Sequence, residues 1–249
     1  MKKFGTNLSK PSQEKLNSLL KYYQAGQYDD AEKLSLSITQ EFSEHPFSWK
    51  ILGAVLKLRG RINESFVAHQ KSVQLDPKDC EAHNNIGLTL LDLGKLEEAE
   101  ESLRQAIKLE PDFAEAHHNL GIILHKLNRL DEAEVSYRNA ITLKSDITDA
   151  HYNLGMILKG LGSLEQAEAS FNEVIALKPE YVEAHNNLGG VLKELGRADE
   201  AQASYKKVLE LKENSGAHYN LSLTLQDLGK LEEAEESLRQ AIKLKPDYE

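Results

Sequence analysis

Apolar residues recur along this chain at the spacing of one face of an α-helix. In segment 93–109, LGKLEEAEESLRQAIKL, the residues Leu96, Leu103 and Ile107 share one helical face, and charged residues fill most of the positions between them. Alternating runs of the kind that form half-buried strands are absent, so the pattern predicts an all-α fold. The same segment returns letter for letter at 228–244. This repetition indicates a structural unit that is copied along the chain.

The copies follow one another with a period of 34 residues. The landmark EAHNNIG begins at Glu81, and close copies of it begin at Glu115, Asp149 and Glu183, each 34 residues after the last. A fifth copy, GAHYNLS at Gly216, comes one residue early. Each landmark opens one helical stretch, a short turn follows, and a second helical stretch completes the unit. Repeats of this kind indicate helix pairs that stack on their neighbours.

The turn inside each unit carries a residue that tolerates the left-handed backbone conformation in which helices often end. These residues are Gly26, Gly60, Gly94, Asn128, Gly162, Gly196 and Gly229. Proline ends several units, because a helix cannot continue through it. The prolines are Pro77, Pro111, Pro179 and Pro246. The order of elements is therefore helix, turn, helix and short loop.

Two rows of small residues complete the pattern. The row in the first helix comprises Gly53, Gly87, Gly121, Gly155, Gly189 and Ser222. The row in the second helix comprises Ala31, Ser65, Ala99, Ala133, Ala167, Ala201 and Ala234. Helices approach closely only where side chains are small. With the period, these rows resemble the tetratricopeptide repeat family over residues 12–249.

The resemblance implies a right-handed superhelical α-solenoid of about seven helix–turn–helix repeats. Their approximate limits are 12–45, 46–79, 80–113, 114–147, 148–181, 182–214 and 215–249. Residues 1–11 are expected to form a flexible N-terminal arm. The last letters, LKPDYE, lie where a junction to another repeat would be, so Leu231, Leu238 and Ile242 are expected to be partly uncovered. We expect either that the chain continues in a longer protein or that this end pairs with another subunit.

Composition and charge exclude several classes of function. The 249 residues are 40% hydrophobic, and no stretch approaches the roughly 18 consecutive apolar residues of a membrane helix. The net charge of −10 argues against binding to nucleic acid or to an anionic membrane, because both need basic surface. The N-terminus has no apolar signal segment, so a cytoplasmic protein is expected. The single cysteine, Cys80, cannot form an internal disulfide.

An asparagine recurs at one place in the first helices. This amide row comprises Asn85, Asn119, Asn153, Asn187 and Asn220. The resemblance implies that first helices line a concave groove, and such a ladder is similar to the one in the repeat region of O-linked N-acetylglucosamine transferases. An amide both donates and accepts hydrogen bonds, so the row could hold the main chain of an extended peptide. The alternative is that these amides hold neighbouring units together.

Two further rows accompany the amides. An apolar row three residues on comprises Ala54, Leu88, Ile122, Met156, Gly190 and Leu223. It indicates either pockets for a partner's apolar residues or partial burial against adjacent helices. Positions that vary between units are the natural place for specificity, and they include Tyr152, Tyr219, Lys159 and Lys193. The lysines are expected to meet carboxylates of a partner.

Catalytic and metal-binding patterns do not emerge from the sequence. The recurring histidines, His83, His117, His151, His185 and His218, are too far apart to share a zinc ion and suit helix packing instead. We therefore expect no enzyme activity, no metal and no cofactor. The leading hypothesis is a scaffold that binds a protein or peptide segment. The alternatives are the recognition arm of a larger enzyme whose transferase domain follows Glu249, and a solenoid that self-associates through its uncovered C-terminal end.

Overall fold

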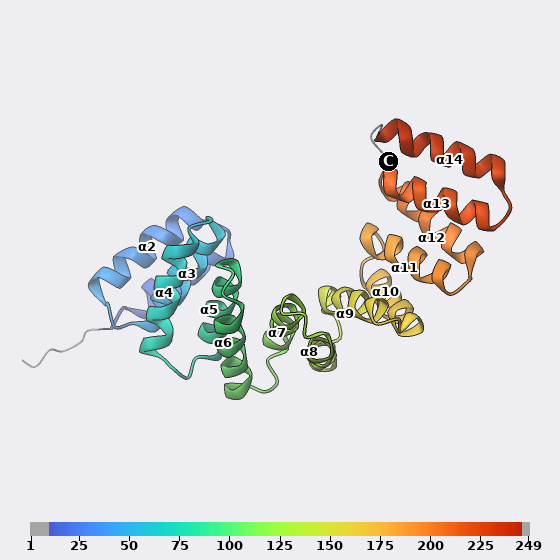
Figure 1. The fold of residues 1–249 in the computed structure, drawn as a ribbon. Coiled ribbons are helices and arrows are strands. Elements are labelled where there is room, and N and C mark those ends of the chain that lie inside the picture. Colours follow the sequence, from blue (N-terminus) through green and yellow to red (C-terminus); the bar gives the residue numbers. More distant parts are fainter. Residues whose placement is uncertain (1–9, 246–249) are drawn as a thin grey trace, which may run out of the picture. The chain divides into compact units, whose positions relative to one another are not determined.

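The computed structural model describes residues 10–245, and every regular element in this range is an α-helix (Figure 1). The helices are α1 (Gln13–Gln24), α2 (Tyr28–Glu41), α3 (Pro46–Leu58), α4 (Ile62–Leu75), α5 (Cys80–Asp92), α6 (Leu96–Leu109), α7 (Ala114–Lys126), α8 (Leu130–Leu143), α9 (Thr148–Gly160), α10 (Leu164–Leu177), α11 (Val182–Glu194), α12 (Ala198–Leu211), α13 (Ser215–Asp227) and α14 (Leu231–Leu244). The predicted fold class, an all-α helical repeat, is confirmed. The handedness of the superhelix and the limits of the repeats stay predictions.

The short turn between paired helices is closed by backbone geometry. At the end of α5, Gly94 has a φ of 73°, and the N–H of Lys95 donates to the carbonyl of Leu90 at 2.9 Å. This bond satisfies a carbonyl that the helix end would otherwise leave open. Asn128 adopts the same left-handed conformation after α7, with a φ of 58°. The residues chosen from the sequence as turn formers are therefore the ones with positive φ.

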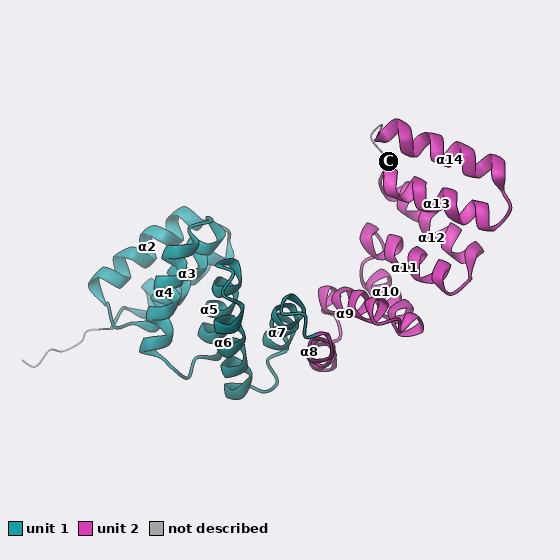
Figure 2. Ribbon diagram, in the orientation of Figure 1, with its two compact units in different colours: residues 1–129 teal, residues 130–249 magenta. Residues whose placement is uncertain are grey.

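The helices form two compact units, Met1–Arg129 and Leu130–Glu249, coloured separately in Figure 2. In the first unit α3 packs on α4 and α5 on α6, while α2, α4 and α6 each also pack on the helix that follows. In the second unit α9 packs on α10, α11 on α12 and α13 on α14, and α8, α10 and α12 likewise contact the next helix. Helices α2, α4, α6, α10 and α12 thus contact both the first helix of their own repeat and that of the next one.

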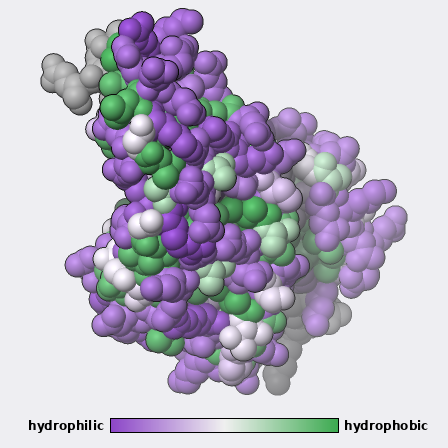
Figure 3. Space-filling view, turned by 90° about the vertical axis from the view of Figure 1, so that its right-hand side faces the viewer, coloured by the Kyte–Doolittle hydropathy of each residue, from purple (hydrophilic) through white to green (hydrophobic). Residues whose placement is uncertain are grey.

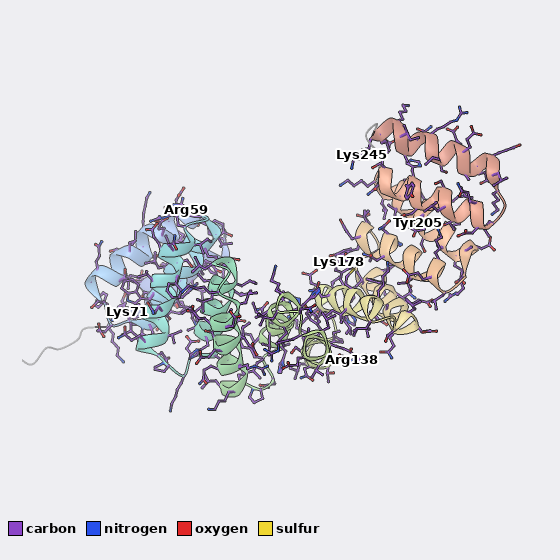
Figure 4. All side chains as sticks on the ribbon, in the orientation of Figure 1. Arg59, Lys71, Arg138, Lys178, Tyr205 and Lys245 are labelled. Carbon is purple, nitrogen blue, oxygen red and sulfur yellow. The ribbon has the colours of Figure 1, made fainter. Side chains whose placement is uncertain are left out.

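The small residues of the first helices lie where the two helices of a repeat meet. A Cβ atom built on Gly87 would stand 2.9 Å from Cγ of Leu103, and one on Gly155 would stand 2.8 Å from Cε1 of Phe171. Gly189 faces Tyr205, a residue of α12 labelled in Figure 4, in the same way. Real Cβ atoms do not make contacts this short with other side chains, so glycine sets the spacing of these helices.

The second repeat replaces part of this apolar contact with polar side chains. His69 occupies the position that Leu103 holds in the next repeat, and its imidazole lies against Gly53. The ring is 1% exposed, and its Nδ1 lies 2.9 Å from the hydroxyl of Thr89. Ser65, also fully buried, donates to the carbonyl of Gly53 at 2.8 Å. The core of the first unit therefore contains a buried polar cluster beside its aliphatic side chains.

The ends of the chain bear on two expectations. Residues 1–9 lie outside the described part, so the predicted arm over 1–11 falls almost wholly there. Helix α1 begins at Gln13, and the hydroxyl of Ser12 caps it by accepting from the N–H of Lys15. At the other end of the described chain, Leu231 is 67% exposed and Ile242 48% exposed. The expected exposure of the last helix is thus present among the residues up to 245.

Candidate protein-interaction surface

The amide row connects neighbouring first helices. In the first unit, Nδ2 of Asn119 donates to Oδ1 of Asn84, one repeat earlier, at 2.8 Å. In the second unit, Nδ2 of Asn187 donates to the hydroxyl of Tyr152 at 3.0 Å. Asn220 makes a longer contact of the same kind, 3.5 Å to Asn186. These bonds show that the amides do hold neighbouring repeats together.

The same amides keep part of their hydrogen-bonding capacity. Asn187 also donates to the carbonyl of Glu183 at 2.9 Å, so its amino group is used and its carbonyl oxygen is the group that a peptide N–H would approach. All five members of the amide row are partly exposed rather than buried. They therefore lie at a surface that a partner can reach, with bonds to the neighbouring repeat already formed for several of them.

The apolar row is partly exposed as well. Leu88 and Ile122 of the first unit are half-buried, and Met156 of the second unit is 37% exposed. Gly190 leaves room for a long side chain from the preceding repeat, because a Cβ there would stand 3.0 Å from Nζ of Lys159. The space-filling view shows apolar residues in green as small patches in a mainly hydrophilic surface (Figure 3). Both interpretations of the row remain compatible with this intermediate burial.

The lysines of the first helices point to acidic residues of the next repeat. Nζ of Lys159 lies 3.6 Å from a carboxylate oxygen of Glu194, and Nζ of Lys193 lies 3.4 Å from Asp227. In the first unit, Lys57 pairs with Asp92 at 2.6 Å. Exposed pairs of this kind are worth about 0–1 kcal/mol. A partner carboxylate would therefore exchange with an existing, weak ion pair instead of meeting a free ammonium group.

The two tyrosines assigned to specificity differ in their exposure to solvent. The ring of Tyr152 lies 5.2 Å from that of Tyr181 and 5.9 Å from that of Phe171, and its hydroxyl accepts from Asn187. Burial raises the pKa of the Tyr152 phenol, so the group stays neutral at physiological pH. Tyr219 is 37% exposed on α13. Tyr152 thus helps to build the surface, and Tyr219 offers more of its ring to a partner.

The recurring histidines have a structural role that sequence reasoning only partly found. Nε2 of four of them donates to a backbone carbonyl six residues earlier, in the loop that precedes the helix, at 2.9–3.0 Å. The pairs are His83 with Pro77, His117 with Pro111, His151 with Ser145 and His185 with Pro179. Trp49, which replaces histidine in the second repeat, makes the same bond through its indole to Ser43 at 2.8 Å. The row therefore fastens loops to helices.

The last histidine of the row lies in a different environment. His218 follows the loop that is one residue shorter, and its Nδ1 is buried with no partner among the described residues.

The part of the chain between residues 10 and 245 contains no cluster of three side chains able to hold a metal ion. Within that range no helix has both the length and the apolarity to span a bilayer. The thiol of Cys80 contacts the carboxylate of Glu110, and burial together with that carboxylate raises its pKa to about 11.

Three depressions lie on the surface of the described residues. One is between α1 and α2, around Tyr22 and Lys33, and one is at the 177–183 loop beside Tyr181. The third lies along the outer side of α6, between Glu97 and Lys108. None of the three is lined by a residue of the amide or apolar row. A groove along the first helices accordingly stays a prediction.

Comparison with known families covers most of the repeats. Sequence models described as tetratricopeptide repeat match residues 70–101, 114–147, 146–214 and 180–247, and one described as TPR repeat matches 87–128. A search of curated proteins found no match. The matches follow one another along the chain from residue 70 to residue 247, and neighbouring ones overlap or adjoin.

Several solved structures resemble the chain. The crystal structure of MamA is 28% identical, with a TM-score of 0.61, over 65% of this chain and 95% of that one. YrrB, described as a TPR protein with an unusual peptide-binding site, is 25% identical, with a TM-score of 0.68, over 73% and 94%. PilF of Pseudomonas aeruginosa is 19% identical, with a TM-score of 0.70, over 81% and 92%, and supports the fold alone.

Proposed function

This chain belongs to the tetratricopeptide repeat family, and from that premise we propose that its first helices bind an extended peptide or protein segment. Its fold and its structural neighbours support a protein-interaction scaffold in general. The finer assignment to the first-helix surface rests on the residues found there. One neighbour, YrrB, is described as having a peptide-binding site, which favours a peptide as the partner class.

The observation that carries the proposal is the pairing of partly exposed amides with partly exposed apolar side chains on the same helices. Asn119 and Ile122 stand one helical turn apart on α7, and Asn153 and Met156 do so on α9. Amides can bond the main chain of a peptide, while the apolar side chains three residues on can contact every second side chain of the peptide. This combination suits a segment whose backbone is held generally and whose side chains are read in places.

The lysines beside the amides add a charge preference to the proposal. The neighbouring ion pairs of Lys159 and Lys193 are weak enough to rearrange, so acidic side chains of the peptide would find basic partners beside the amides. The net charge of −10 makes such local basic groups the main source of attraction for an acidic segment. We propose that the segment carries alternating apolar and acidic residues.

The proposal is tested with a library of random peptides displayed on phage and selected on the full chain. Affinities of the selected peptides are then measured by calorimetry for the native chain and for the triple variant Asn119→Ala, Asn153→Ala, Asn187→Ala. We expect the triple variant to lose about tenfold or more in affinity, because each lost hydrogen bond is worth roughly 1 kcal/mol. Circular dichroism checks that the helices remain.

A matched control makes the result specific to the first helices. Glu97, Glu101 and Glu232 are exposed on second helices. Changing all three to alanine makes the same number of substitutions as the asparagine variant but leaves the first helices unchanged. This control should bind the selected peptides as the native chain does, after allowance for its lower negative charge. Equal affinity of the asparagine variant and the native chain would show that the peptides bind elsewhere.

A further inference from the structure

Helices α6 and α14 have the same sequence, LEEAEESLRQAIKL, in different surroundings. Any difference in exposure between them therefore comes from their neighbours. Helix α6 packs on α5 and on α7, whereas α14, in the part of the chain that the structure describes, packs on α13. The comparison shows which side chains the helix of a following repeat covers.

The residues that differ form one stripe. Leu103 of α6 is fully buried and Leu96 and Ile107 are half-buried. On α14 the equivalent of Leu103 is only half-buried, and the equivalents of Leu96 and Ile107 become 67% and 48% exposed. The uncovered stripe comprises Leu231, Glu235, Leu238 and Ile242, spaced as i, i+4, i+7 and i+11 on one helical face. An apolar stripe of this kind marks a contact surface.

The carboxylate in the stripe adds a charge requirement. In α6, the carboxylate of Glu100 forms an ion pair with Nε of Arg104 at 2.8 Å. It forms a second ion pair, at 2.7 Å, with Nη1 of Arg129, which follows the turn after α7. The side chain of Glu100 is 14% exposed. The equivalent Glu235 has Arg239 at 2.6 Å and a side chain that is 65% exposed. The bond that Glu100 makes to the next repeat has no described counterpart at Glu235.

This basic contact recurs between repeats, and we call it the inter-repeat clasp. A basic residue just after the turn of one repeat reaches the same position in the second helix of the repeat before it. Besides Arg129 with Glu100, the pairs are Arg61 with Glu32, Lys95 over the ring of Phe66, Arg197 with Glu168, and Lys230 with Gln202. The junction of Glu134 and Ser163 departs from this rule, and there Glu134 pairs with Arg138 of its own helix.

We propose that the uncovered stripe of α14 is a second docking site, and that its occupant is a helix of the first-helix type followed by a turn and an arginine or lysine. The stripe supplies the apolar contact that α6 gives to α7, and Glu235 supplies the carboxylate of an inter-repeat clasp. Within the described chain, α7 with Arg129 is the nearest likeness of this helix–turn–basic occupant. This site is independent of the amide row, so neither depends on the other.

The test uses the full chain and a fluorescein-labelled peptide with the sequence of residues 111–129, PDFAEAHHNLGIILHKLNR. Fluorescence anisotropy should show saturable binding, because this peptide contains the helix that covers the identical surface of α6. Ile242→Glu should weaken binding about tenfold or more, since it places a charge in the apolar contact. Lys243→Glu, one position away and exposed, is the matched control and should change affinity far less.

A charge swap tests the clasp itself. Glu235→Lys should weaken the native peptide about fivefold, the size of a partly exposed ion pair. A peptide in which Arg129 is replaced by glutamate should bind poorly to the native chain and regain affinity for Glu235→Lys. Glu235 is exposed on the helix surface, so circular dichroism is expected to be unchanged by the substitution.

Several outcomes would overturn the proposal. One is the absence of saturable binding at the highest soluble peptide concentration, and another is equal binding to the native chain and to Ile242→Glu. Failure of the charge swap would remove the clasp from the argument. Sedimentation that shows self-association, abolished by Ile242→Glu, with no peptide binding to the monomer, would assign the stripe to a second copy of this chain instead.

Discussion

The buried His69 predicts that the first unit loses stability in mild acid. Its ring is 1% exposed, and the hydroxyl of Thr89, which donates to the carbonyl of Asn85 at 2.9 Å, accepts from Nδ1. Nε2 therefore carries the free lone pair, and it is buried against Gly53 with no partner among the described residues. A proton added to Nε2 would be buried, and although the nearby backbone carbonyl of Lys50 favours the charged ring, the cost of burial outweighs it. The neutral ring is the form that the fold accommodates.

The size of the effect follows from the shift in pKa. Burial, helped by the positive charge of Lys57, lowers the pKa of His69 from 6.5 to about 4. The unfolded chain binds a proton below pH 6.5 that the folded chain binds only near pH 4. The stabilising contribution is thus complete above pH 6.5 and is lost as the pH falls toward 4. It amounts to about 3 kcal/mol in all, of which about 2 kcal/mol is lost by pH 5.

The assay compares the native chain with His69→Leu in urea at a series of pH values between 7 and 4. Leucine fits beside a glycine at this position in the next repeat, where Leu103 lies against Gly87. The single tryptophan, Trp49, packs on the core cluster that includes Leu52, so its fluorescence reports on this repeat. A local probe is needed, because repeats unfold with limited cooperativity.

The quantity to follow is the difference in the free energy of unfolding between the native chain and His69→Leu, since other titrating groups contribute equally to both. The native chain should lose stability relative to His69→Leu by about 2 kcal/mol between pH 7 and pH 5. A difference that stays constant over this range would refute the reasoning, because it would mean that the ring takes up its proton equally well in the folded and unfolded states.

Three further predictions concern packing, loops and surface charge. Gly155→Ala should destabilise the second unit by about 1–3 kcal/mol through overlap with the aromatic ring that the glycine faces, whereas Gly160→Ala, with open space around it, should be neutral or stabilising in urea unfolding. His185→Phe should cost about 1 kcal/mol by removing the bond to its loop carbonyl, while His218→Phe, which removes a buried unpaired nitrogen, should cost less in a thermal melt. Arg197→Ala should lower the stability of the second unit only slightly at low salt, and the loss should shrink as salt is added to the urea series.

Much of the fold could be read from the sequence, because its determinants are local or strictly periodic. The helical spacing of apolar residues, the turn-forming Gly94 and Asn128, and the small Gly87 and Gly155 act within one repeat. Their effects do not depend on how the next repeat is oriented. The expected all-α helical repeat followed from these features, and the structure confirms it.

The contacts between repeats were harder to find. The bond from Asn119 to Asn84 and the pair of Lys193 with Asp227 join residues one period apart, and they depend on how helices stack. Sequence reasoning left the role of the amides open, and it assigned the lysines to a partner's carboxylates without finding their ion pairs to the next repeat. A signal did exist for the inter-repeat clasp, since most of the second-helix positions that it joins are followed, after the next turn, by a basic residue.

The dependence on a fixed period also bears on how such a chain can change over evolutionary time. The clasps, and the bonds of the amide row to Asn84, Tyr152 and Asn186, join one repeat to its neighbour, so inserting or deleting a complete unit leaves such groups with an equivalent partner. Loss of a single residue shifts the groups that follow it out of this correspondence, as in the loop before His218, where the landmark comes one residue early. Duplication of whole units, which the identical segments 93–109 and 228–244 suggest, is accordingly the kind of lengthening that this architecture tolerates best.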